Sequence, residues 1–418
     1  MTIFHLAWRN LTNRPLSMLL TLGLFALAVG LSSLFLLLNQ QLTDKFEKNL
    51  AGIDLVVGAK GSPLQLILCN MYHIDVPTGN ISLKSARPFL NPRHPLIKNA
   101  IPLSLGDSYK KYRIVGTLPD FIGLYKGQIA KGHIWNKTME TTIGATVAAQ
   151  TGLKIGDTFH SNHGLTIDGD EHEEQPFDVV GILRPTGTVL DQLILTASES
   201  CWQVHEHHNH EVNEDTSMAT PTLPIDPRSR LLQADSTKQI TSLLIQFKGR
   251  NVQTLNFQRN LNENTDMQAA TPALEINRLF EMVGFGERAL KALLALIIGV
   301  SGFSIFIALF NSLKDRRYEL ALLRVMGAGK SRLFLLIITE GLLLSLMGFA
   351  LGIVLSHGAM QVLGSYMTDT YRYAFSGTIW VREEWFLGIG SLMMGFIAAI
   401  IPAFRAYKTD ISRTLSKN

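Results

Sequence analysis

Four stretches of the chain are long, apolar and almost free of charge, and they restrict the possible folds more than any other feature. They cover residues 16–38, 292–313, 333–356 and 386–404, and Glu340 is the one charged residue within them. A helix needs about 20 apolar residues to cross the roughly 30 Å hydrocarbon core of a bilayer. The sequence therefore predicts four transmembrane helices.

A cleaved signal peptide is the alternative interpretation of the first stretch. Such a peptide has an apolar core of roughly 7–15 residues that ends at a small-residue cleavage site. Residues 16–38 form a longer run, and the polar sequence Asn39-Gln40-Gln41 follows it. This pattern favours an uncleaved membrane anchor.

Lysine and arginine residues cluster in three of the segments that flank these helices. They are Arg9 and Arg14 before the first helix, Lys314, Arg316, Arg317, Arg324, Lys330 and Arg332 between the second and third, and Arg405, Lys408, Arg413 and Lys417 after the fourth. Cytoplasmic segments carry an excess of such residues. We therefore predict a multi-pass protein of the plasma (bacterial inner) membrane with both termini in the cytoplasm and a large domain outside it.

The segment between the first two helices combines strand and helix patterns. Short runs rich in β-branched residues predict strands at 54–57, 112–115, 177–180 and 243–247. Residues 63–71 and 273–282 predict helices, and the second of these would continue into the second transmembrane helix as a stalk. The predicted fold class is therefore a four-helix membrane protein with a large α+β extracytoplasmic domain.

The predicted segments follow one another in a simple order. They are an amphipathic cytoplasmic segment (1–15), the first span (16–38), the extracytoplasmic domain (39–285) with a His-rich loop near 203–230, the stalk and second span (286–313), a cytoplasmic loop (314–332), the third span (333–356), an outer loop (357–385), the fourth span (386–404) and a cytoplasmic tail (405–418).

Composition and motifs exclude several functions. A formal net charge of +4 is too small to indicate nucleic-acid binding. The segment Gly327-Ala328-Gly329-Lys330-Ser331 resembles a P-loop, but Arg324 stands where that motif needs its first glycine. We therefore expect a non-catalytic chain, with ATP hydrolysed by a separate subunit. Cys69 and Cys201 form no metal-binding pair, and a disulfide between them is permitted but not implied.

A cluster of histidines suggests a metal site. His205, His207, His208 and His210 lie within six residues, and His160, His163 and His172 precede them. Neutral imidazole is a common ligand for zinc and related divalent metals, and short His-rich tracts often bind metal. The alternative is a solvated loop that takes up metal only weakly.

The third apolar stretch contains two further features. A carboxylate within a span is costly, so Glu340 should face protein or a polar cavity and couple the third helix to neighbouring elements. The alternative is a residue near the interface that reaches the headgroups. Small residues that allow close helix packing lie along one ridge of this stretch. These are Gly341, Ser345, Gly348 and Gly352, and the pattern is equally compatible with packing within one subunit and across a dimer.

Several segments resemble the FtsX-like permeases of ABC transporters, and MacB most. The resemblance rests on Ala7-Trp8-Arg9-Asn10-Leu11, on residues 316–328, on Ile338-Thr339-Glu340-Gly341, on Pro402-Ala403-Phe404-Arg405-Ala406 and, in the outer domain, on residues 152–159 and 177–183.

This resemblance implies a permease that works as a homodimer with a separate ABC ATPase. The ATPase would dock on the 314–332 loop, through Arg316, Arg317, Glu319, Arg324 and Gly327, and its closure would move the outer domain by mechanotransmission and so export or release a cargo. Membrane lipid and a periplasmic adaptor or substrate protein are further expected partners. Two alternatives stay open, a regulatory adapter that activates an outer hydrolase and a metal-linked membrane sensor.

Overall fold

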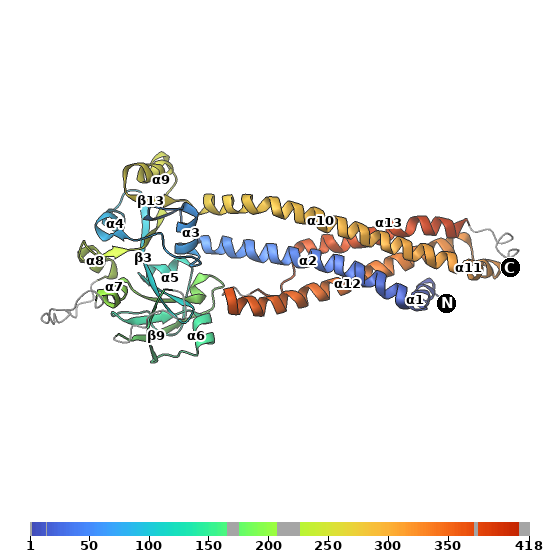
Figure 1. The fold of residues 1–418 in the computed structure, drawn as a ribbon, viewed down its shortest axis with the longest axis horizontal. Helices are drawn as coiled ribbons and strands as arrows, with labels where there is room; N and C mark the ends of the chain where they lie inside the picture. Colours follow the sequence, from blue (N-terminus) through green and yellow to red (C-terminus); the bar gives the residue numbers. More distant parts are fainter. Residues whose placement is uncertain (1, 14, 165–174, 207–225, 372–374, 409–418) are drawn as a thin grey trace. The chain divides into compact units, whose positions relative to one another are not determined.

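The structure is a computed structural model that describes residues 2–13, 15–164, 175–206, 226–371 and 375–408. The chain divides into two compact units, which we call the helical unit and the sheet domain (Figure 1). The helical unit comprises Met1–Thr43 and Met282–Asn418, and the sheet domain comprises Asp44–Glu281.

Within the described residues, the helical unit is built from six helices, two of which extend into the sheet domain. They are α1 (Ile3–Thr12), α2 (Pro15–Leu50), α10 (Pro272–Asp315), α11 (Arg317–Val325), α12 (Lys330–Tyr371) and α13 (Arg382–Tyr407). In the part of the chain that the structure describes, four segments are long and apolar enough to cross a membrane: Pro15–Leu50, Gly286–Asp315, Lys330–Tyr366 and Arg382–Tyr407. Together with the sheet domain between the first two, they confirm the predicted fold class.

Close backbone contacts hold three of these helices together. An added Cβ atom at Gly341 of α12 would lie 2.7 Å from the Ala399 Cβ of α13, and one at Gly352 would lie 2.8 Å from the Ala26 carbonyl oxygen of α2. Gly348 likewise packs directly against Phe25. The small residues therefore let α12 pack against both α2 and α13 within one chain.

Gly327 forms the sharp turn between α11 and α12. Its φ of +95° lies in the left-handed region, which side chains other than glycine rarely adopt. The Ala328 amide donates to the Leu323 carbonyl at 3.0 Å, which satisfies one of the last carbonyl groups of α11. Gly327, which the resemblance assigned to docking, therefore has a clear structural reason to be glycine.

The sheet domain is organised around one large mixed sheet. Its principal strands are β1 (Leu55–Ala59), β3 (Ile97–Tyr109), β4 (Tyr112–Thr117), β5 (Ile129–Gly132), β6 (Glu140–Ile143), β9 (Phe177–Leu183), β10 (Leu193–Ala197), β12 (Ser242–Phe247) and β13 (Met267–Ala270). Their order is β13-β1-β12-β3-β4-β10-β6-β9-β5, with β7 (Thr158–Phe159) on β9 and β8 (Asn162–His163) on β3. The pairs β4–β10 and β6–β9 are parallel, and the other pairs are antiparallel.

Short helices complete the domain around this sheet. They are α3 (Pro63–Met71), α4 (Leu83–Leu90), α5 (Asp120–Leu124), α6 (Ala145–Thr151), the 3-10 helix η1 (Val189–Gln192), α7 (Ser198–Glu206), α8 (Pro227–Gln233) and α9 (Val252–Asn264), with a small pair of strands β2 (Ile81–Ser82) and β11 (Gln239–Ile240). The buried core includes Val56, Leu66, Phe121 and Leu195. All four predicted strands are present, and the predicted helix over 63–71 is α3.

Candidate functional site

Glu340 is a buried carboxylate that contacts two other segments of the chain. It lies in α12, and its side chain is 1% exposed. Asn10 of α1, which is also buried, donates from Nδ2 to Glu340 Oε1 at 2.6 Å. The same oxygen lies 3.4 Å from Nη1 of Arg316, the residue that precedes α11. A single oxygen atom therefore joins α1, α12 and the start of α11.

Arg316 connects this buried group with the exposed face of α11. While Nη1 faces Glu340, its Nε donates to Glu319 Oε2 at 3.0 Å, and its side chain is only 13% exposed. The guanidinium group is planar and offers several donors in a fixed geometry, which suits it to two carboxylates at once. Arg316 therefore fixes the position of α11 relative to α12.

A small cavity lies beside Glu340. It has a volume of about 40 Å³, and several polar side chains contribute to its lining, among them Ser17, Thr21, Asn311 and Ser312. A cavity of that size with several polar neighbours has room for water. The Glu340 carboxylate thus faces protein and a polar cavity, and its hydrogen-bond partners, Asn10 and Arg316, come from other segments of the chain.

The outward face of α11 combines apolar and charged side chains. Leu320 and Ala321 are buried in the helical unit, whereas Tyr318, Leu322, Val325 and Met326 are exposed to between 46% and 71%. Arg317 and Glu319 are exposed beside them, and Arg324 is half-buried. Exposed apolar groups with charged neighbours are typical of a protein-binding surface. Of the five residues implied in docking, Arg317 and Glu319 are the most accessible charged side chains, and Arg316 faces inward.

Helix α1 packs against the rest of the helical unit through one of its faces. Ala7 and Leu11 are buried in the same apolar cluster as Leu320 and Leu336, while Phe4 and Trp8 are exposed. The amphipathic pattern expected for this segment therefore has a protein-facing side. Sequence reasoning did not assign Asn10 a role, and its position on the buried face, three residues after Ala7, was the available signal.

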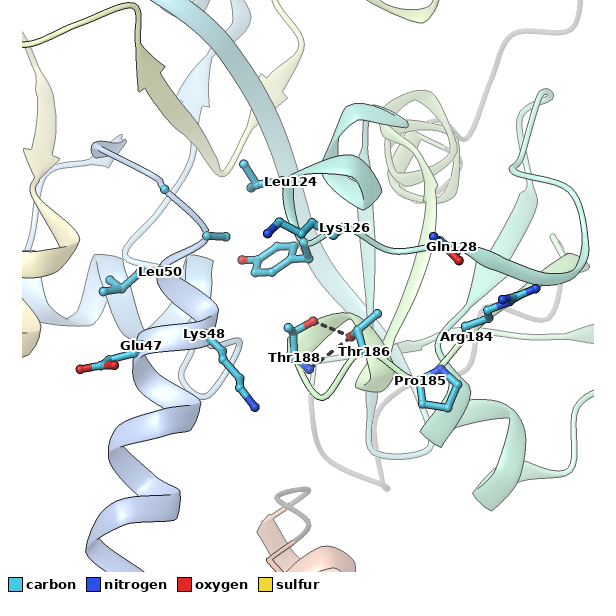
Figure 2. A pocket seen from close by; sticks show the side chains of 13 residues that line it. Glu47, Lys48, Leu50, Leu124, Lys126, Gln128, Arg184, Pro185, Thr186 and Thr188 are labelled. Atoms are coloured by element: carbon cyan, nitrogen blue, oxygen red, sulfur yellow. Dashed lines mark hydrogen bonds between the residues drawn. The ribbon is translucent and has the colours of Figure 1, made fainter. Parts of the chain in front are cut away.

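The sheet domain contains a second candidate site, a pocket of about 790 Å³ (Figure 2). Its lining includes three cationic side chains, Lys48, Lys126 and Arg184, and one carboxylate, Glu47. Figure 2 shows Glu47, Lys48 and Leu50 on the last turns of α2, with the Lys48 side chain pointing toward the side where Thr186 and Thr188 lie. The excess of positive charge suits an anionic group.

Buried polar contacts give this pocket a defined shape. Asp191 accepts hydrogen bonds from the backbone of Thr186 at 2.8 Å and of Gly187 at 2.7 Å, and Asn49 accepts one from Val189 at 2.9 Å. The Tyr125 hydroxyl, also in the lining, is buried and has no hydrogen-bond partner among the described residues. Burial, and to a lesser extent Tyr72, raises the pKa of Tyr125, so its hydroxyl stays neutral.

The predicted metal site lies largely outside the described residues. His207, His208 and His210, and the side chain of His205 at the end of α7, lie outside the part of the chain that the structure describes. Within the described ranges, no group of three or more His, Cys, Asp or Glu side chains is placed to hold a metal ion. The metal site therefore stays a prediction.

The two cysteines are free and buried. Cys69 lies 3.3 Å from Arg113 Nη1, and Cys201 lies 3.7 Å from the Ser104 carbonyl oxygen. Burial raises the pKa of both thiols, and Arg113 opposes this only in part at Cys69. Neither is therefore a ready thiolate nucleophile.

Comparison with known proteins locates one family signature. Residues 291–411 match the family model described as "FtsX-like permease C-terminal". The chain is also similar to a structure described as the extracellular domain of the noncanonic ABC-type transporter YknZ from Gram-positive bacteria, with 11% identity over 52% of this chain and 99% of that one. The TM-score of that match is 0.28, too low to support an inference. No curated protein sequence matches the chain significantly. The part of the chain that is similar to the C-terminal domain of FtsX-like permeases, residues 291–411, includes α11, Glu340 and most of three apolar helices.

Proposed function

We propose that this chain is the transmembrane subunit of an ABC transporter, and that it couples ATP hydrolysis on a separate subunit to movement of the sheet domain and release or export of a cargo. The observation that carries the proposal is the joint formed by α11 and Glu340. A nine-residue helix exposes an apolar and charged face, while Arg316 at its start is bonded to a buried carboxylate of α12.

This joint has the properties that force transmission requires. A partner bound to the outer face of α11 would push on Leu320, which packs into the helical unit, and on Arg316, which is bonded to α12. Helix α10 ends at Asp315, directly before Arg316, and it begins at Pro272 within the sheet domain. A displacement of α11 would therefore reach the sheet domain along a continuous helix of 44 residues.

We propose further that two copies of the chain assemble around the apolar helices. Only 28% of the most apolar stretch of α10 is buried within one chain, the lowest share among the four candidate spans. Leu293, Leu296, Val300 and Phe303 are exposed on it. Lipid and a second copy are the partners suited to such a surface. Light scattering of the purified chain in detergent would give the oligomeric state, and a monomer at all concentrations would contradict a dimer.

The docking proposal has a direct test. The double variant Tyr318→Ala/Met326→Ala removes one exposed side chain of α11 and one directly after it, without changing the buried face of the helix. Co-purification of the ATPase with the chain should fall at least tenfold, because apolar side chains at the centre of an interface typically contribute about 1–3 kcal/mol each. The variant Trp385→Ala removes an equally exposed aromatic side chain from α13 and should have no effect. Undiminished co-purification with the first variant would show that α11 is not the docking surface.

A regulatory adapter is the second candidate function, and the pocket of the sheet domain favours it. A pocket of the sheet domain with three cationic side chains suits contact with an outer protein or another ligand. The charge-removing variant Lys126→Ala/Arg184→Ala distinguishes the two functions. If this variant no longer binds a protein partner outside the cytoplasm while transport is unchanged, the result would support the adapter function.

A further inference from the structure

A second buried carboxylate, Glu384, joins three helices at the other end of the helical unit. It lies in the first turn of α13 and is fully buried. Its Oε1 accepts a hydrogen bond from the Ser33 hydroxyl of α2 at 2.5 Å and lies 3.1 Å from Nε2 of His357 on α12. Its Oε2 accepts the backbone N–H of Val381 at 3.0 Å. Neither the motifs of the sequence nor the proposed function makes use of this group.

The hydrogen-bond partners of His357 determine how many protons the pair holds. Nδ1 lies 2.6 Å from the Gly377 carbonyl oxygen, and Nε2 lies 3.1 Å from the Glu384 carboxylate. A carbonyl oxygen and an ionised carboxylate can only accept, and a neutral imidazole has one ring hydrogen to donate. A neutral His357 beside an ionised Glu384 would therefore leave one of the two contacts without a hydrogen. One further proton, on either side chain, supplies it.

The neighbouring hydroxyl groups show the same shortage of hydrogens. Ser356 donates to the Ile353 carbonyl at 2.9 Å, Ser33 donates to Glu384, and the two hydroxyl oxygens lie 2.7 Å apart. Two hydroxyl hydrogens thus serve three contacts. A proton on Glu384 Oε1 could be donated to Ser33, which would release the Ser33 hydrogen for Ser356. The proton that completes the His357 contacts cannot complete this one as well, so filling both would take two protons.

Few other charges act on this pair. Residues 16–43 of α2, 341–368 of α12 and the loop 375–381 contain no Asp, Glu, Lys or Arg. Arg382 and Glu383 belong to the same turn of α13 but are exposed. The Trp380 ring stacks on His357, with 5.6 Å between ring centroids, and covers it on one side. Within the part of the chain that the structure describes, Glu384 is the ionisable side chain bonded to His357.

The proton also fastens a loop. In the loop 375–381, the Gln41 side chain of α2 exchanges two hydrogen bonds with the Ser376 backbone, at 2.8 and 2.9 Å. The Gly377 amide donates to Gln361 of α12 at 3.1 Å, and its carbonyl oxygen accepts from His357. If the proton leaves, His357 can donate to Gly377 or to Glu384, but not to both. The loop then loses a bond to α12, or α12 loses its bond to α13.

We propose that His357 and Glu384 form a proton-binding site that fastens the loop 375–381 to α12 and α13. With the proton bound, the three helices and the loop are joined. As the pH rises and the proton leaves, one of the joining bonds is lost. In the predicted topology, this end of the helices faces the outside of the cytoplasm, so the site responds to the pH of that compartment. The site does not depend on an ATPase, so the proton-binding proposal can be tested independently of the proposed transport function.

Hydrogen–deuterium exchange of the full chain in detergent tests the proposal. The amides of Ser376 and Gly377, which donate to Gln41 and Gln361, report whether the loop is fastened. After correction for the intrinsic pH dependence of exchange, their protection should fall at least about tenfold between about pH 6 and about pH 9. Peptides within 341–352 should keep their protection, which excludes general unfolding. Constant protection of the loop in the unmodified chain would overturn the proposal.

Variants assign the effect to the pair. His357→Gln should give low protection of the loop at every pH, and His133→Gln, which alters an exposed histidine of the sheet domain, should keep the response of the unmodified chain. A pH response that survives in His357→Gln would overturn the proposal. If that variant does not fold, Glu384→Gln serves instead, because its amide cannot bind the proton. Persistence of the response in Glu384→Gln would equally refute the site.

Discussion

Removal of the Asn10 side chain should release α1 from the helical unit. In the structure, Asn10 Nδ2 donates to Glu340 at 2.6 Å, and the carboxylate is 1% exposed. A hydrogen bond to a charged group contributes about 1.5–3 kcal/mol, because an unsatisfied buried acceptor keeps its desolvation cost. Arg316, at 3.4 Å, satisfies Glu340 only in part. In Asn10→Ala the population of undocked α1 should therefore rise roughly 10- to 150-fold.

The labelling rate of a buried cysteine on α1 measures this population. Leu11 is 9% exposed on the docked face, so a cysteine in its place should react with maleimide mainly when α1 is undocked. The native cysteines are both buried, and the chain without Leu11→Cys gives their background. Arg9→Ala, which removes an exposed side chain of the same helix, should change the rate less than twofold. An equal increase in Asn10→Ala and Arg9→Ala, or no increase in either, would refute the role of the Asn10–Glu340 bond.

Three further predictions concern topology, metal and the sheet domain. A reporter that is active only outside the cytoplasm should be active when fused after Gly187 and silent when fused after Ala328, and the reverse pattern would contradict the predicted orientation. Calorimetry of the full chain with zinc should show binding that is lost when four histidines are changed to Ala, namely His205, His207, His208 and His210. The binding should weaken below about pH 6.5, where imidazole is protonated. Equal binding by the unmodified chain and the variant would leave the loop without a metal role. Tyr125→Phe should leave the thermal stability unchanged or raised, since the Tyr125 hydroxyl has no partner among the described residues. Tyr72→Phe removes a 3.0 Å hydrogen bond to the Phe46 carbonyl and should lower the free energy of unfolding by about 0.5–1.5 kcal/mol. A larger loss of stability in Tyr125→Phe than in Tyr72→Phe would contradict this.

The sequence predicted the fold class because its signals are local. An uncharged stretch of about 20 residues indicates a membrane helix without any knowledge of its neighbours. The same holds for β-branched runs such as Phe177–Leu183, which alternates between the two faces of the sheet. Strand β3 was not predicted, because Pro102 and Gly106 interrupt its pattern within Ile97–Tyr109.

The contacts of the candidate site could not be predicted, because they join distant residues. Asn10 and Glu340 are 330 positions apart, and Ser33 and Glu384 are 351 apart. Asparagine and serine near an apolar run have many ordinary roles, so their residue types alone indicate no partner. Glu384 falls within residues 357–385, which the sequence predicts as an outer loop. Its position three residues after Val381, where a glutamate side chain can bond back to the start of its helix, was the one local signal of its structural role.

The two buried carboxylate sites act on the same helix and complement its small residues. Glu340 and His357 are 17 residues apart on α12, about 25 Å along the helix axis, and the stretch between them contains no charged side chain. In that stretch Gly341, Gly348 and Gly352 bring the backbone of α12 close to its neighbours. Such flat contacts depend on van der Waals packing and specify the position of a helix along its axis only weakly. The polar bonds at both ends therefore determine the register of α12. Loss of either bond would leave the packing of α12 largely intact while permitting a small shift along its neighbours, which is the kind of movement that the coupling we propose would use.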